Sequence, residues 1–234
     1  MEHLTIKEQN SIFKSLPLDV WERVSNKIEL VDMTLGLILS RSGETQTYLY
    51  FPTTSIVAVL YELEDGTSAT MALVGREGCA GVAIFMGGQS TITTHIVQIA
   101  GAGYRIKANL IQESFARAGP LMIALLKYTQ SFIVQVTQTA VCNRHHSIKQ
   151  QFCRYLLLLL DRLPSDEFNV THELIAQSLG VRREGITEVA GALQKNGLIK
   201  YARGHIKVLD PEGLEKQSCE CYKVVKKEYA RLLC

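Results

Sequence analysis

The stretch that decides the fold lies towards the C-terminal end, where residues 171–209 read THELIAQSLGVRREGITEVAGALQKNGLIKYARGHIKVL. Its first part, 171–179, predicts a short amphipathic helix with Thr171 as the N-cap. Gly180 supplies the backbone freedom for a tight turn, and apolar residues then repeat at helical spacing over 182–196. Two helices joined by a short turn that contains glycine are typical of a helix-turn-helix.

A β-hairpin is expected after the second helix. Gly197 is placed to end that helix, and two short runs, 198–201 and 205–209, flank Ala202-Arg203-Gly204. Helix, turn, helix and hairpin in this order describe a winged helix-turn-helix, which is a more specific pattern than the two helices alone. Residues 143–234 carry 15 basic and 11 acidic side chains, a balance of +4, which favours a polyanion as partner.

The whole chain has 234 residues, 47% of them hydrophobic and 21% charged, with a net charge of +2. That composition excludes a disordered chain and a disulfide miniprotein. The apolar run 155–160 is too short to cross a bilayer, which needs about 20 residues, and the N-terminal residues do not read as a signal peptide. We therefore expect a cytoplasmic protein that does not bind membranes and whose six cysteines are thiols.

The N-terminal half shows a pattern typical of strands rather than of helices. Between Glu29 and about Ile106 the apolar residues come in short β-rich runs separated by turn residues, and Asp65-Gly66 predicts a hairpin. Such runs indicate a sandwich, jelly roll or barrel of roughly 80 residues. The predicted fold class is α+β, with an N-terminal jelly-roll β-barrel, a long dimerisation helix and a C-terminal winged helix-turn-helix.

A long helix is expected from Glu113 to about Arg144. Apolar residues on it step by three or four positions and predict a seam between two subunits, made by Leu121, Leu125, Tyr128, Phe132, Val136 and Thr139. A second apolar face is left for the barrel, made by Ile123, Leu126, Ile133 and Val134. The alternative is a helix that packs only on its own barrel. The expected division is residues 1–112 for the barrel, 113–146 for the helix and hinge, and 147–234 for the winged helix-turn-helix.

Over roughly residues 10–210 the chain resembles the Crp–Fnr superfamily of bacterial transcription regulators. The motifs that carry the resemblance are Tyr50-Phe51-Pro52 with Asp65-Gly66, Val74-Gly75-Arg76-Glu77-Gly78 ahead of Gly81, Arg154-Tyr155-Leu156-Leu157 with Asp161-Arg162, and Leu179-Gly180-Val181-Arg182-Arg183-Glu184. The resemblance implies an effector-sensing, cyclic-nucleotide-binding-like β-roll and a homodimer on double-stranded DNA, with RNA polymerase as a further partner. No catalytic motif is present, so we expect no enzyme.

In relatives of this kind the recognition helix begins with an Arg-Glu pair, which Arg183 and Glu184 match here. Arginine can donate two hydrogen bonds to guanine, and glutamate can accept one from cytosine. Relatives often carry an arginine four residues after the glutamate, where this chain has Glu188, so their usual half-site is not carried over. The full expected set for DNA is Thr171, Arg182, Arg183, Glu184, Thr187, Glu188, Arg203, His205 and Lys207.

The segment that would bind a cyclic nucleotide departs from the resemblance. Relatives that bind one have an arginine for its phosphate, but no arginine occurs between Arg76 and Arg105. A buried phosphate without a paired cation is poorly compensated. We therefore expect that cyclic AMP is not the effector, and that an unknown small molecule or no effector occupies the roll. The candidate effector pocket comprises Glu77, Gly78, Gly81, Gln89, Ser90 and Thr91.

The cysteines leave one alternative open. Iron–sulfur relatives place cysteines near the N-terminus, whereas the first cysteine here is Cys79. Cys142 with His145 and His146 could ligate a metal or haem at the hinge, and Cys219-x-Cys221 forms a lone pair near the C-terminal end. The favoured interpretation is ordinary surface residues, with no metal and no cofactor. The alternative function is a thiol- or metal-based redox sensor that uses its helix-turn-helix for protein contacts.

Overall fold

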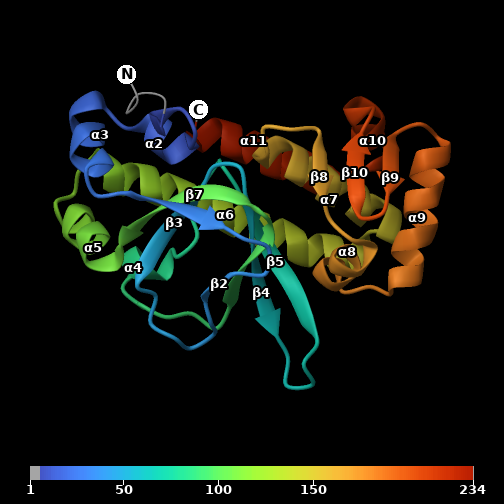
Figure 1. The fold of residues 1–234 in the computed structure, drawn as a ribbon, viewed down its shortest axis with the longest axis horizontal. Helices are drawn as coiled ribbons and strands as arrows, with labels where there is room; N and C mark the ends of the chain where they lie inside the picture. The colour runs from blue at the N-terminus through green and yellow to red at the C-terminus, as the bar shows by residue number, and fades with distance from the viewer. Residues whose placement is uncertain (1–5, 234) are drawn as a thin grey trace.

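A computed structural model describes residues 6–233 (Figure 1). A β-rich part, here called the β-domain (residues 6–116), lies at one end, and a smaller part, the winged-helix domain (residues 147–217), lies at the other. The long helix α6 (Pro120–His145) runs behind both, and α11 (Glu220–Leu233) returns along it. Among residues 6–233, no helix is long and apolar enough to span a lipid bilayer.

Two antiparallel sheets form the β-domain. One has the order β1-β7-β3 and the other β2-β6-β4-β5. Apolar side chains from both sheets meet in the core, among them Met33, Val57 and Val97. The strands are β1 (Glu29–Met33), β2 (Ile38–Ser40), β3 (Tyr48–Pro52), β4 (Ile56–Glu62), β5 (Ser68–Val74), β6 (Thr94–Ile99) and β7 (Gly101–Lys107); the helices are α2 (Ser11–Ser15), α3 (Leu18–Ser25), α4 (Ala83–Met86) and α5 (Ala108–Ala116).

Strand β7 begins at Gly101 and contains a second glycine, Gly103. A Cβ on Gly101 would lie 2.5 Å from the carbonyl oxygen of Thr54, and one on Gly103 would lie 2.6 Å from the sulfur of Met33. Glycine inside a strand often marks such a close approach. The two glycines therefore let β7 lie between β1 and β3.

The helix expected to start at Glu113 is two helices, because the chain breaks between them. Ala118 has a positive φ of 51°, and Pro120 occupies the first turn of α6, where a missing N–H costs nothing. At its other end α6 continues to His145, so the segment predicted to be a hinge is helical up to that residue, and His146 is the C-cap. Ser147 then caps α7 (Ile148–Arg162) through a capping box with Gln150.

The face of α6 that was predicted to form a subunit seam packs largely on the chain's own β-domain. Leu125 and Tyr128 are fully buried and Leu121 nearly so, all in the core of the chain's own β-domain, while Phe132 and Val136 are partly buried against it. Leu121, Leu125 and Tyr128 therefore have no surface left for a second subunit, and this part of the predicted seam is corrected. The face assigned to the barrel is the one that the chain leaves open, with Ile123, Leu126 and Ile133 about half exposed.

Helix α7 joins the two domains. Phe152, Leu156 and Leu159 are buried and pack with the helices and strands that follow. The other elements of the winged-helix domain are β8 (Glu167–Asn169), α8 (His172–Leu179), α9 (Arg183–Lys195), β9 (Ile199–Ala202), β10 (His205–Val208) and α10 (Pro211–Gln217). Strand β8 pairs with β10 to give the order β8-β10-β9, so the predicted hairpin has a third strand. This strand was not predicted, because three residues are too few to show a strand pattern in the sequence.

Helix α11 fastens the end of the chain to the β-domain. It contacts α6, α7 and α2. The ring of Tyr229 meets Tyr128 edge-on at a centroid distance of 6.5 Å, and Leu233 packs against the core that holds α2. The segment after the wing therefore does not extend away from the molecule but lies along α6 (Figure 1).

Candidate nucleic-acid interface

One face of α9 anchors the helix and the other is free. Ile186, Ala190 and Leu193 are buried at helical spacing against the winged-helix core. Gly180, with a φ of +64°, ends α8, and the N–H of Val181 donates to the carbonyl of Ala176 at 3.0 Å, which fixes the turn into α9. The exposed face holds five of the residues expected to contact DNA, namely Arg182, Arg183, Glu184, Thr187 and Glu188.

Side-chain contacts between α8 and α9 set their register. Nδ1 of His172 lies 3.1 Å from Oγ1 of Thr187, and its ring stacks on Tyr201 at 4.0 Å. Burial, with Arg183 nearby, lowers the pKa of His172 and favours a neutral ring. The guanidinium of Arg183 lies 4.0 Å from the carboxylate of Glu173, an exposed contact that is easily exchanged for another anion.

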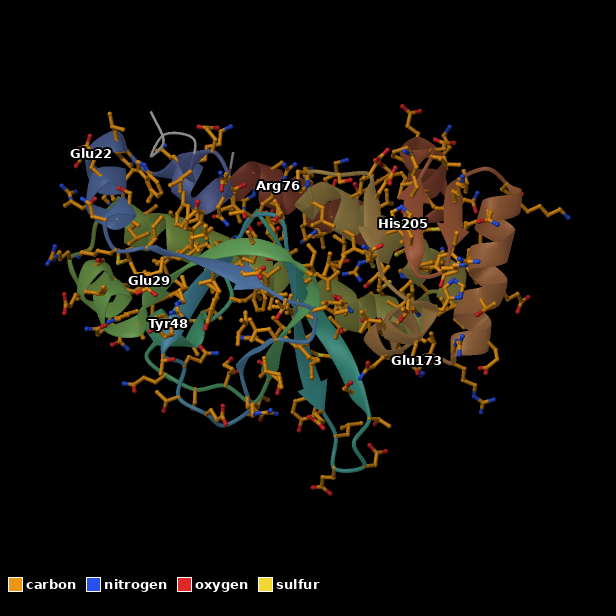
Figure 2. All side chains as sticks on the ribbon, in the orientation of Figure 1. Glu22, Glu29, Tyr48, Arg76, Glu173 and His205 are labelled. Atoms are coloured by element: carbon orange, nitrogen blue, oxygen red, sulfur yellow. The ribbon has the colours of Figure 1, made fainter. Side chains whose placement is uncertain are left out.

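The structure divides the wing residues expected to contact DNA into two kinds. Nζ of Lys207 lies 2.5 Å from Glu167 on β8, and Nε2 of His205 lies 3.1 Å from the same carboxylate. The hydrogen bonds from Lys207 and His205 lower the pKa of the Glu167 carboxyl. Arg203, by contrast, is exposed at the tip of the hairpin with a positive φ of 50°. Of these three wing residues, Arg203 thus has a positive charge without an ion-pair partner in the described chain, whereas His205, labelled in Figure 2, contacts Glu167.

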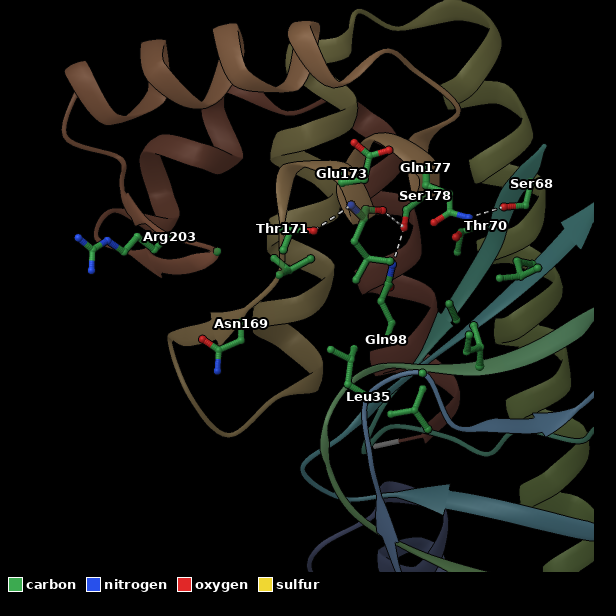
Figure 3. A pocket seen from close by; sticks show the side chains of 18 residues that line it. Leu35, Ser68, Thr70, Gln98, Asn169, Thr171, Glu173, Gln177, Ser178 and Arg203 are labelled. Carbon is green, nitrogen blue, oxygen red and sulfur yellow. Dashed lines mark hydrogen bonds between the residues drawn. The ribbon is translucent and has the colours of Figure 1, made fainter. Parts of the chain in front are cut away.

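A cavity of about 570 Å³ lies between the two domains (Figure 3). Thr171 and Gly204 line it from the winged-helix side, and Leu35 and Gln98 line it from the β-domain. The amide of Gln98 donates to the hydroxyl of Ser178 across this boundary. Thr171 caps α8 by accepting from the N–H of Leu174 at 3.2 Å, so it lies at the domain boundary and not on the exposed face of α9.

A smaller cavity of about 200 Å³ lies between the β-domain and α6. Its walls are largely apolar, and no arginine of the described chain lines it; the lining residues are Gln46, Val59, Met71, Val82, Ala83, Thr91, Thr93, His95, Phe132 and Val136. Of the residues expected to form an effector pocket, Thr91 alone lines this space. Gln89 and Ser90 are exposed at the surface.

The other expected effector residues have structural contacts instead. The carboxylate of Glu77 accepts the N–H of Gly75 at 3.0 Å and pairs with the buried guanidinium of Arg162 at 3.0 Å. A Cβ on Gly78 would overlap the ring of Tyr128, so this glycine permits the close approach of α6. Gly81 occupies a positive φ of 118° beside the start of α4. Glu77 therefore links the β-domain to α7 and does not line the cavity that Thr91 lines.

Four potential metal ligands also meet at the end of α6. The sulfurs of Cys142, Cys219 and Cys221 and a ring nitrogen of His146 all lie within 4.8 Å of one another. Along the chain these residues form two separate groups, with 72 positions between His146 and Cys219, so the sequence gives no sign that they meet. His145, the other histidine expected at the hinge, is exposed outside this cluster.

The comparisons with known proteins agree with this architecture. Residues 150–217 match the family model described as "Crp-like helix-turn-helix domain". The chain is 23% identical to the global nitrogen regulator of Synechococcus elongatus over 199 residues, which cover 81% of this chain and 90% of that protein. The fold is similar to that of FixK2 from Bradyrhizobium japonicum, with a TM-score of 0.71, 14% identity, and coverage of 82% of this chain and 98% of that one. It is also similar to a CRP/FNR-family transcriptional regulator from Thermus thermophilus, with a TM-score of 0.60, 22% identity, and coverage of 81% and 98%.

A β-domain and a long connecting helix precede the winged helix-turn-helix, and this last part matches a Crp-like helix-turn-helix domain. The predicted resemblance is confirmed: residues 150–217 are a Crp-like helix-turn-helix domain, and the chain as a whole has the fold of the Crp–Fnr regulators. The predicted fold class is confirmed with it.

Proposed function

We propose that the protein is a homodimeric, sequence-specific DNA-binding regulator that inserts the exposed face of α9 into the major groove. The observation that carries this proposal is the division of α9, whose apolar face is buried while Arg182, Arg183 and Glu184 are exposed at its N-terminal end. Recognition helices of this class contact base edges with their N-terminal residues. Arg183 and Glu184 supply the base contacts, and Arg203 at the wing tip supplies a phosphate contact.

Selection from random oligonucleotides, followed by titrations on the enriched site and on random DNA, tests this readout. Arg183→Ala should weaken binding to the enriched site about 5- to 150-fold, because a bidentate base contact discriminates by about 1–3 kcal/mol. Arg203→Ala should weaken both DNAs equally and reduce the salt slope by about one. Lys195→Ala, at the other end of α9, is the matched control. An enriched site bound equally by wild type and Arg183→Ala would exclude this register of α9.

The dimer contact in this proposal uses the open face of α6. Ile123, Leu126, Ile133 and Val141 are 51%, 47%, 54% and 42% exposed in the single chain. Their spacing of three, seven and eight residues places them along one side of the helix, as in a two-helix seam. A dimer about this seam gives the two α9 helices the two-fold symmetry that a palindromic site requires.

Ile133→Glu should yield a folded monomer in sedimentation, since the side chain already faces solvent in the single chain. Leu63→Glu, at a comparably exposed apolar residue next to the Asp65-Gly66 turn, is the control for replacing exposed apolar surface by a charge away from α6. A dimer that persists at the same concentration in Ile133→Glu would show that the subunits associate elsewhere.

We also propose that the β-domain does not respond to cyclic AMP. The small cavity between the β-domain and α6 offers His95, Gln46 and two threonines as polar groups but no cation for a phosphate among the residues described. Burial lowers the pKa of His95 to about 4, so this ring is neutral near pH 7 and does not replace the missing arginine. Calorimetry at high nucleotide concentration should show no saturable heat. A micromolar dissociation constant, about −8 kcal/mol, would refute this part of the proposal.

A further inference from the structure

The four-residue cluster at the end of α6 has the composition of a metal site. Cys142 and His146 are four residues apart and so lie on one side of the helix, where α6 ends. Cys219 and Cys221 flank the first residue of α11. The three cysteines are 0%, 3% and 1% exposed, and the His146 side chain is 12% exposed. Three buried sulfurs and one imidazole are the ligands that zinc takes in closed structural sites.

The distances fit a single tetrahedral ion. With Zn–S near 2.3 Å and Zn–N near 2.0–2.1 Å, the edges of a tetrahedron are about 3.8 Å between two sulfurs and about 3.6 Å between sulfur and nitrogen. The sulfurs of Cys142 and Cys219 are 3.5 Å apart, and that of Cys221 is 3.6 Å from Nδ1 of His146. An iron–sulfur cluster would spread its ligands over several irons, whereas all four ligand atoms here lie within 4.8 Å.

The surroundings of His146 are those of a metal ligand. Its Nδ1 faces the cluster, and its Nε2 lies 3.4 Å from the carboxylate of Glu220. Metal-bound histidines commonly donate their second N–H to a carboxylate, which orients the ring and strengthens the ligand. The amide of Gln151 also donates to the carbonyl of His146 at 2.9 Å and so holds the backbone of the turn.

The charge balance supplies a second, independent observation. Arg154 is 4% exposed, and none of the ion pairs among residues 6–233 gives it a carboxylate partner. Its Nη2 donates to Thr139 at 2.8 Å, while its buried Nε has no hydrogen-bond partner in the described chain. Arg154 lies close enough to Cys142, Cys219 and Cys221 for charge on their sulfurs to act on it. Three thiolates around one divalent ion carry a net charge of −1, which balances this guanidinium.

We propose that Cys142, His146, Cys219 and Cys221 bind one structural zinc ion. Binding takes the three sulfurs as thiolates and releases three protons, and it needs no oxidant or reductant. The ion joins the C-terminal end of α6, which belongs to the β-domain side, to the N-terminal end of α11, which follows the winged-helix domain. It therefore fixes the chain between α10 and α11 to the end of α6, where the two domains meet.

The test begins with the full chain, expressed with zinc in the medium and purified under reducing conditions without chelator. Elemental analysis should find about one zinc per chain. Removal with a chelator and refilling with Co²⁺ should give the intense visible bands and the near-ultraviolet thiolate charge-transfer band of a tetrahedral sulfur-rich site. Zinc no higher than in the buffer, together with no such cobalt spectrum, would overturn the proposal. A Cys142–Cys219 disulfide in a chain that takes up no metal after reduction would overturn it as well.

Variants then assign the ligands. His146→Asn and Cys219→Ser should lose the cobalt spectrum, and Glu220→Gln should weaken zinc binding about 10- to 100-fold. The matched controls are His145→Asn, at the neighbouring exposed histidine, and Cys153→Ser, at a buried thiol outside the cluster. Equal metal content in His145→Asn and His146→Asn would refute the assignment. Circular dichroism identifies any variant that fails to fold, and the wild-type cobalt spectrum and Glu220→Gln still decide the question.

Discussion

Replacing Arg162 by methionine should destabilise the protein more than any surface change, because this guanidinium holds the two domains together. Arg162 is 3% exposed, and its Nε pairs with Glu77 of the β-domain at 3.0 Å. Its other nitrogens donate to the carbonyl of Leu158 at 3.1 Å and to the side-chain oxygen of Gln135 on α6 at 3.0 Å. Methionine has a similar length and fills the same space without these donors.

The magnitude follows from what the substitution leaves behind. Removing one partner of a buried ion pair costs about 3–5 kcal/mol, since the other charge stays buried without compensation. The Glu77 side chain is 14% exposed, so water replaces the guanidinium only in part. For a chain of this size each kcal/mol lowers Tm by about 2–4 °C, which gives a loss of about 6–20 °C. Adding Glu77→Gln to Arg162→Met should restore part of the loss, because the unpaired charge is then removed.

Urea unfolding at pH 7 measures this effect with two probes. The sole tryptophan, Trp21, is buried in the β-domain and reports on that part, while circular dichroism reports on all helices. Arg23→Met is the control, since its pair with Asp19 is exposed and should be worth less than about 1 kcal/mol. If Arg162→Met costs no more than Arg23→Met, the buried pair does not join the domains and the reasoning fails.

Three further changes test other parts of the structure. Gly78→Ala should cost about 1–3 kcal/mol, because its Cβ meets the ring of Tyr128; an unchanged urea midpoint would show that α6 moves away freely. Burial lowers the pKa of His95 from its ordinary 6.5 to about 4, so the unfolded chain takes up the proton first. The free energy of unfolding is therefore highest above pH 6.5 and falls by at most about 3 kcal/mol as the pH drops towards 4, because the proton binds more tightly to the unfolded chain. His95→Gln should therefore lose less stability than wild type between pH 7 and pH 5 in urea titrations, and an identical loss would contradict the burial. Glu167→Gln frees Lys207 from its carboxylate partner, so the salt slope of DNA binding should steepen by about one per subunit; an unchanged slope would show that Lys207 does not reach the phosphates.

The elements built from local patterns were predictable. The turn at Gly180, the anchored face of Ile186, Ala190 and Leu193, and the hairpin around Gly204 are encoded by residues close together in the chain. Apolar periodicity and turn residues within such short segments predict helices and turns without knowledge of the tertiary fold. The expectation that the winged helix-turn-helix lies at the C-terminal end rests on them and is confirmed by the matching family model.

The faces of α6 were not predictable in the same way. Two stripes on one helix, one through Leu125 and one through Ile133, are both apolar enough to be buried. Periodicity shows that each stripe needs a partner but does not say which partner is the chain's own β-domain. The break before α6 carried a readable signal, Gly119-Pro120, whereas strand β8 had only Phe168 as a buried apolar residue.

Contacts between distant segments account for the remaining differences. Lys207 looked free in the sequence, yet antiparallel pairing of β10 with β8 sets it directly opposite Glu167. The residues of the cysteine cluster come from two segments that only the return of α11 brings together. Glu77 belongs to a motif that implied an effector, but the pairing with Arg162 depends on how α7 docks. Each of these depends on tertiary packing rather than on a local preference.

The return of α11 along α6 limits how the winged-helix domain moves. A body attached at one point can turn about any axis through that point, but a body attached at two points can turn only about the line that joins them. The winged-helix domain is attached at Ser147, where the chain enters it, and again through α11, whose Tyr229 and Leu233 are embedded beside the β-domain. Two further contacts cross the same boundary, the Gln98–Ser178 hydrogen bond and the Glu77–Arg162 ion pair, so a swing about that line requires these contacts to break.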